Sequence, residues 1–107
     1  MKILLDECVT KRLKRYLYGH EVLTVTHKGW NGLKNGNLLD KMIEDNFDLL
    51  LTIDKNILYQ RKVENYNIII AELDTPSSSI EAIYRFVPRF TELLPSFEKR
   101  NLYIISL

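Results

Sequence analysis

The sequence has little of three things: cysteine, net charge and long apolar runs. Its single cysteine, Cys8, has no second cysteine with which to form a disulfide in the chain. No apolar run approaches the roughly 18 residues of a membrane-spanning helix, and no signal-like segment opens the chain. We therefore expect a cytoplasmic protein with no membrane partner. The formal charge of +1 excludes a polycation that binds nucleic acid through its overall charge alone.

The composition of the 107 residues is ordinary for a folded protein. Hydrophobic residues make up 46% of the chain and charged residues 27%, as in many globular domains. This length supports one packed core and is too short for two. Without an internal repeat or a linker, residues 1–107 are expected to form a single domain.

Short apolar runs alternate along the chain with segments of helical periodicity. The runs predict five strands, at residues 1–5, 21–27, 47–53, 67–73 and 101–107. The helical patterns predict a first helix that Gly19 ends, a second around residues 38–45, a short third at residues 55–64, and a fourth that begins with a capping box of Ser78 and Glu81. Pro88 and Pro95 should divide the segment between this fourth helix and the last strand.

This alternation predicts an α/β fold. Several strands are continuously apolar, which is typical of a parallel sheet covered by helices on both faces. We expect a three-layer sandwich with a mainly parallel five-stranded sheet in the order 2-1-3-4-5. Ligands of such sheets bind beyond the carboxyl ends of the strands, where the winding direction reverses. Here that point lies between the first and third strands.

Both of these strands end on a carboxylate. Asp6 follows the first apolar run and Asp54 follows the third. Two carboxylates on adjacent strand ends repel each other, and Mg²⁺ or Mn²⁺ would relieve that repulsion while holding a phosphate-bearing substrate. The alternative is that each aspartate only caps the helix that follows it. Taken as a pair, they favour a metal site.

Four segments carry a resemblance to a known family. In chain order, "LLDE", "GHEVLTV", "GWNGLKNG" and "FDLLLTIDKNILYQ" resemble the small bacterial PIN-like proteins, over about residues 1–73. The resemblance implies a metal-dependent ribonuclease that cuts single-stranded or loop RNA, with Asp6 and Asp54 as catalytic metal ligands. It also implies a toxin with a small antitoxin protein as its partner, and a possible homodimer.

The chain departs from the family at several asparagines. Asn37 stands where relatives usually have a glutamate at the start of the second helix, and would act as an uncharged catalytic helper. Asn35 and Asn56 stand where broader relatives often have aspartate. These two asparagines and Glu7 are possible supporting residues, although successive residues of a strand point to opposite faces, which can turn Glu7 away from Asp6.

Basic and aromatic residues around the proposed cleft are candidates for RNA binding. Lys34 and Lys55 border the acidic strand ends, and Trp30 could stack on a base or cover the core. Lys28, Arg61 and Lys62 could also ring the strand ends. The four cations of the first helix, Lys11, Arg12, Lys14 and Arg15, could contact phosphates, but such a face is more often simply solvated. Cys8 is expected to be a small buried thiol.

Two other function classes stay open. The asparagines are compatible with a degenerate, non-catalytic PIN-like module that binds RNA or a partner protein. A receiver-type phosphoacceptor domain also places acids at the ends of its first and third strands. A receiver should carry a lysine after its fifth strand, whereas this chain ends in "NLYIISL".

Overall fold

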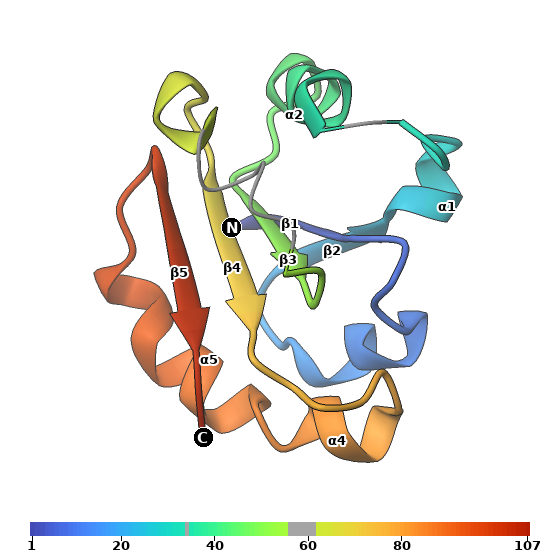
Figure 1. Cartoon of the computed structure of the whole chain (residues 1–107), viewed down its shortest axis with the longest axis vertical. Helices are drawn as coiled ribbons and strands as arrows, with labels where there is room; N and C mark the ends of the chain where they lie inside the picture. Colours follow the sequence, from blue (N-terminus) through green and yellow to red (C-terminus); the bar gives the residue numbers. More distant parts are fainter. Residues whose placement is uncertain (34, 56–61) are drawn as a thin grey trace.

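Five parallel strands form one sheet in the order β2-β1-β3-β4-β5, as Figure 1 shows. The computed structural model describes residues 1–33, 35–55 and 62–107. The strands are β1 (Lys2–Leu5), β2 (Glu21–Thr24), β3 (Leu49–Thr52), β4 (Ile69–Leu73) and β5 (Asn101–Ile105). The predicted α/β class, the parallel sheet and its strand order are confirmed.

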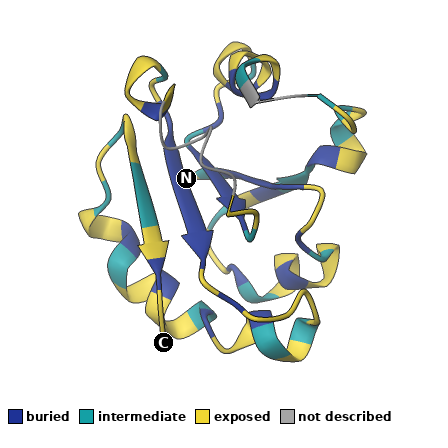
Figure 2. Ribbon diagram, viewed as in Figure 1, coloured by how far each residue is buried: buried dark blue, intermediate teal, exposed yellow. Residues whose placement is uncertain are grey.

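Helices cover both faces of the sheet, which makes a three-layer sandwich. One face packs against η1 (Lys11–Tyr16), α4 (Ile80–Tyr84), α5 (Val87–Leu93) and η3 (Leu94–Ser96). The other packs against α1 (Val25–Lys28), α2 (Asn35–Glu44) and η2 (Val63–Asn65). Every residue of β3 and β4 is buried, as Figure 2 shows for the centre of the sheet, because both of their faces are covered.

The segment after β1 differs from its prediction. We expected an α-helix, but Lys11–Tyr16 is a 3₁₀-helix, in which the amide of Leu13 donates to the carbonyl oxygen of Thr10 at 3.1 Å. Its N-cap is Thr10, whose hydroxyl accepts from the amide of Arg12, so Asp6 does not cap this helix. The helix ends at a C-cap on Leu17, and Gly19, with φ +80°, lies in the turn that follows.

Two other boundaries were also predicted wrongly. The second strand stops at Thr24, because the Thr24 hydroxyl accepts from the amide of His27 and thereby caps helix α1. Near the C-terminus the N-cap is Ser79, which accepts from the amide of Ala82, and not Ser78. The prolines do divide this region, since Pro88 lies in the first turn of α5 and Pro95 in that of η3.

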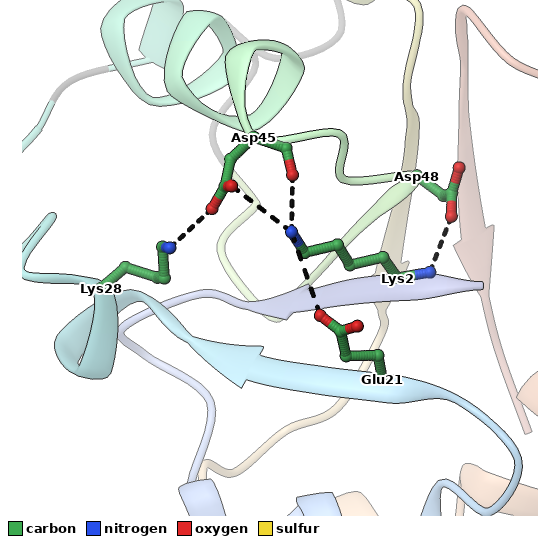
Figure 3. A network of polar contacts seen from close by, with 5 residues as sticks. All are labelled: Lys2, Glu21, Lys28, Asp45 and Asp48. Atoms are coloured by element: carbon green, nitrogen blue, oxygen red, sulfur yellow. Dashed lines mark hydrogen bonds and ion pairs between the residues drawn. The ribbon is translucent and has the colours of Figure 1, made fainter.

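A network of lysines and carboxylates ties together the amino end of the sheet (Figure 3). The backbone amide of Lys2 donates to Oδ2 of Asp48 at 2.7 Å, and Nζ of Lys99 lies 3.0 Å from Oδ1 of Asp48. Nζ of Lys2 bonds to the carbonyl oxygen of Asp45, and Nζ of Lys28 lies 2.6 Å from Oδ2 of Asp45. Lys28 therefore belongs to this network and does not border the carboxyl ends of the strands.

Candidate metal and phosphate site

The carboxyl end of the sheet gathers polar side chains from three adjacent strands. Asp6 follows β1, Thr52 ends β3, and Glu72 is the fourth residue of β4. Leu5 pairs with Leu51 and Thr52 pairs with Glu72, so the three polar residues form one row across β1, β3 and β4. They alternate with residues of the opposite face and thus share the face that α1 and α2 cover.

Thr52 connects the two aspartates that were predicted as metal ligands. Its hydroxyl donates to Oδ2 of Asp6 at 2.8 Å, and the hydroxyl oxygen of Thr52 accepts from the backbone amide of Asp54 at 3.0 Å. The other oxygen of Asp6, Oδ1, accepts from the amide of Glu7 at 2.9 Å. Both oxygens of Asp6 are therefore held in place, and each keeps acceptor capacity for a ligand.

Burial makes the charged form of Asp6 unfavourable. The residue is only 6% exposed, and this desolvation raises the pKa of its carboxyl above the ordinary 3.8. The bonds from Thr52 and from the amide of Glu7 lower that pKa, whereas the nearby charges of Asp54 and Glu7 raise it. A cation at this position would remove the cost of holding these charges together.

Burial also makes the charged form of Glu72 unfavourable. It is 4% exposed, and burial raises the pKa of its carboxyl above the ordinary 4.5. The charge of Lys55 lowers that pKa, and the charges of Asp74 and Asp54 raise it. Glu72 was not among the residues predicted from the sequence, although it is the one carboxylate inside the apolar run "NIIIAEL".

The residues present fit a site for Mg²⁺ or Mn²⁺ that a substrate completes. Within residues 1–33, 35–55 and 62–107, no three side chains of His, Cys, Asp and Glu are arranged to hold a metal ion by themselves. Mg²⁺ does not need such a group, because it commonly binds through one or two carboxylates and fills its other positions with water and substrate phosphate. Asp6 and Asp54, whose charges act on each other, are the candidates for these two carboxylates, and Glu72 would add negative charge.

The residues predicted to assist Asp6 and Asp54 are exposed where the structure describes their side chains. Glu7 is exposed, and its Oε2 accepts from Nδ2 of Asn31 at 3.3 Å. Asn37 is exposed on α2, and its side chain makes no hydrogen bond to Asp6 or Asp54 in the described part of the chain. Asn35 begins α2. The predicted roles of the Asn35 side chain, and of Lys34 and Asn56, concern residues or side chains outside those described.

Two of the predicted RNA contacts have protein partners. Nζ of Lys55 lies 2.7 Å from Oδ1 of Asp74, and this bond raises the pKa of Lys55. Trp30 is partly buried and packs edge-on against Phe47, with Nζ of Lys28 at 5.1 Å from its ring. The structure thus places Trp30 over the core. The helix at residues 55–64 was predicted to carry Arg61, which lies outside the described residues.

Cys8 also differs from expectation, because it is exposed and not buried. Although the residue as a whole is exposed, its sulfur lies 3.7 Å from Oγ1 of Thr52, and partial desolvation of the sulfur raises the pKa of the thiol. A raised pKa keeps the thiol protonated, which argues against a thiolate nucleophile.

An open cavity of about 920 Å³ lies beside Asp6. Four cations of η1 line it together with Asp6, Glu7 and residues of β2 and α1. From the sequence, these cations were expected to form a solvated face, and the 3₁₀ conformation that places them here was not predicted.

Comparisons with known proteins identify no relative. Among protein-family models, curated proteins and solved structures, nothing matched this chain. None of the described helices is long and apolar enough to cross a membrane.

Proposed function

We propose that this chain is a nuclease that hydrolyses phosphodiester bonds of RNA with the help of Mg²⁺ or Mn²⁺. The observation that carries the proposal is the row of Asp6, Thr52 and Glu72, with Asp54 beside it, at the carboxyl end of a parallel sheet. This is the edge at which open α/β sheets bind their ligands. Buried carboxylates in excess at such an edge are typical of a site that a cation completes.

The residues have distinct roles in this proposal. Asp6 and Asp54 would hold the cation, and the hydroxyl of Thr52 fixes the orientation of the Asp6 carboxylate. A divalent cation bound there would stabilise the charge that develops on the phosphate and its leaving oxygen. Glu72, whose carboxyl has a raised pKa, is suited to exchange a proton with water or with the leaving group. Asn37 is the uncharged helper that the resemblance suggests.

The resemblance to PIN-like proteins supports RNA as the substrate and supports a toxin role. An antitoxin partner and a homodimer stay predictions of that resemblance. The competing proposal is a PIN-like module that binds RNA without cutting it, which the uncharged Asn37 favours. The two proposals differ in turnover, and a cleavage assay separates them.

The decisive experiment measures cleavage of a labelled single-stranded RNA with Mn²⁺ or Mg²⁺. Asp54→Asn and Asp6→Asn should each lower the cleavage rate by at least about a hundredfold, because each removes a charge that holds the cation. Asp40→Asn is the matched control, since Asp40 is exposed on the outer side of α2, and it should cleave like the wild type.

Equal residual cleavage by wild type and Asp54→Asn would identify a contaminating nuclease and favour the non-catalytic module. In that case the cleavage rate of Asn37→Glu, which introduces the charge that relatives have at this position, tests whether the lack of that charge makes the site inactive. Cleavage that does not depend on a divalent cation would contradict the proposal.

A further inference from the structure

The cavity beside Asp6 has one strongly basic wall. Its lining comprises Asp6, Glu7, Val9, Lys11, Arg12, Lys14, Arg15, Leu23, Thr24, Thr26 and His27. All four cations come from the short helix η1, and the opposite wall consists of the end of β2 and the start of α1. The floor is apolar where Val9 and Leu23 contribute to it. Asp6 lies in the same hollow as the cations.

The 3₁₀ conformation of η1 arranges these cations in two rows. A 3₁₀-helix has three residues per turn, so side chains at positions i and i+3 lie one above the other. Lys11 and Lys14 therefore form one row, and Arg12 and Arg15 form the next. With a rise of about 2.0 Å per residue, the two members of a row are separated by roughly 6 Å along the axis. An α-helix would not align these pairs.

The third row of the helix explains why the cations face the cavity. Leu13 and Tyr16 share that row, and both pack into the core between η1 and the sheet. Tyr16 also contacts Tyr84 of α4, with ring centroids 4.7 Å apart. With one row fixed in the core, the other two rows must point outward, and both line the cavity.

These four cations are not neutralised by the protein. In the part of the chain that the structure describes, none of them forms an ion pair with a carboxylate, whereas Lys2, Lys28, Lys55 and Lys99 all do. Four exposed positive charges in one concave site attract a ligand with several negative charges. The ligand must also tolerate the apolar floor and reach Asp6.

We propose that this cavity binds the backbone of a single nucleic-acid strand, which η1 guides to the carboxylates at the end of the sheet. The inference rests on the proposed function, because it supplies the path of the substrate to Asp6. A cavity of about 920 Å³ is at the upper end of the size of small-molecule sites, so it accommodates a few nucleotides of one strand.

Charge and composition favour nucleic acid over a protein partner. Centres of protein interfaces are depleted of lysine and enriched in large aromatic residues. Among the described residues, the lining of this cavity has two lysines and no Phe, Tyr or Trp, and its two arginines suit either kind of partner. Contacts to phosphate typically come from arginine, lysine and hydroxyl side chains, and Thr24 and Thr26 add hydroxyls here.

The test measures binding of a fluorescein-labelled oligouridine in EDTA, so that no cleavage is required, over a series of salt concentrations. Arg12→Gln with Arg15→Gln should weaken binding about tenfold, and should lower the slope of log K against log salt by roughly 1.4, because two phosphate contacts are lost. Both residues are exposed, and unchanged thermal unfolding verifies that the variant is folded.

The control variant also removes two positive charges, but at positions outside the cavity. Lys41→Gln with Arg89→Gln removes two cations from α2 and α5, both exposed and away from the cavity, and should bind like the wild type. An equal loss in both double variants would show that binding follows overall charge and would overturn the inference. Displacement of the RNA by polyglutamate as effective as by unlabelled RNA would point to an acidic protein segment and would also overturn it.

Failure of this inference can be distinguished from failure of the proposed function. If the oligouridine binds as expected but no metal-dependent cleavage occurs, the cavity is confirmed and the nuclease proposal fails. If cleavage depends on Asp54 but the Arg12 and Arg15 variant has an unchanged KM, the substrate takes another path and the inference fails alone.

Discussion

At the amino end of the sheet, Asp48 accepts hydrogen bonds from the amide of Lys2 and from Lys99, and Asp45 pairs with Lys28. At the carboxyl end, Asp6 and Glu72 are more deeply buried, yet neither forms an ion pair with a cation in the described part of the chain. The two ends thus differ: Asp45 and Asp48 at the amino end stabilise the fold, whereas the fold holds Asp6 and Glu72 at the carboxyl end at a cost.

The pKa shifts follow the same division. Burial raises the pKa of Asp48, but the bonds from Lys2 and Lys99 and the nearby positive charges together lower it by more than burial raises it. The pKa of Asp48 therefore lies below the ordinary 3.8. The bond from Lys28 lowers the pKa of Asp45. At the other end, burial raises the pKa values of Asp6 and Glu72. Groups whose charged form is disfavoured by the fold are more often found at functional sites.

The largest expected effect concerns metal affinity at the carboxyl end. Glu72→Gln should weaken Mn²⁺ binding about tenfold, because it removes a charge from the carboxylate row while keeping its size. Asp48→Asn at the amino end should leave Mn²⁺ binding unchanged. Calorimetric titration measures both affinities.

A variant of opposite sign sharpens this measurement. Lys55→Gln removes the cation that lies near Glu72 and pairs with Asp74, so Mn²⁺ binding should tighten. If Glu72→Gln and Lys55→Gln shift the affinity in the same direction, the carboxyl end does not act electrostatically on the metal.

The next effect concerns stability. Asp48→Asn should lower the free energy of unfolding by about 1 kcal/mol, since it weakens charged hydrogen bonds whose partners are partly screened by solvent. Asp6→Asn should not lower it at neutral pH, because the fold no longer buries a charge. Urea denaturation of the two variants tests this contrast. A larger loss for Asp6→Asn than for Asp48→Asn would contradict it.

The smallest effect is on the pH dependence. Asp6 and Glu72 take up protons at a higher pH in the folded protein than in the unfolded chain, where their pKa values are near 3.8 and 4.5. Above the raised pKa values both carboxyls are charged and destabilise the fold. As pH falls from neutral towards 4.5, wild-type stability should therefore rise relative to that of an Asp6→Asn and Glu72→Gln double variant. As pH falls further, through the lowered pKa values of Asp48 and Asp45, both proteins should lose stability.

Denaturation curves at several pH values give this difference. If the free energies of unfolding of the wild type and the double variant change in parallel between neutral pH and 4.5, the pKa values of the two carboxyls are not raised in the folded protein. Added Mg²⁺ should reduce the difference, because the cation stabilises the charged forms in the folded protein.

The sheet was predictable because its signals are local and repeated. Apolar runs marked all five strands, and the rules for crossovers restricted their order to a few, of which the predicted one is observed. Asp6 and Asp54 were found because each follows such a run. Glu72 was missed because its position beside Thr52 depends on the register between β3 and β4, which single segments do not encode.

The helix boundaries failed for a different reason. "KRLKRY" has apolar residues three apart, which fits one turn of a 3₁₀-helix as well as an α-helix, so packing decided between them. "EVLTVTH" is rich in β-branched residues, but the cap formed by Thr24 turned its second half into helix α1. The basic wall of the cavity depends on the first outcome, and the wall opposite it depends on the second.

The position of β1 has a consequence for how the protein matures. β1 precedes the other strands in the chain but lies inside the sheet, between β2 and β3. The hydroxyl that orients Asp6 comes from Thr52, which lies 46 residues after Asp6 in the chain. The amide of Asp6 also donates to the carbonyl oxygen of Leu51. A chain interrupted before β3 has neither contact. Under the proposed function, an incomplete copy would leave the RNA around it intact, and cleavage would begin only once distant parts of the chain have met.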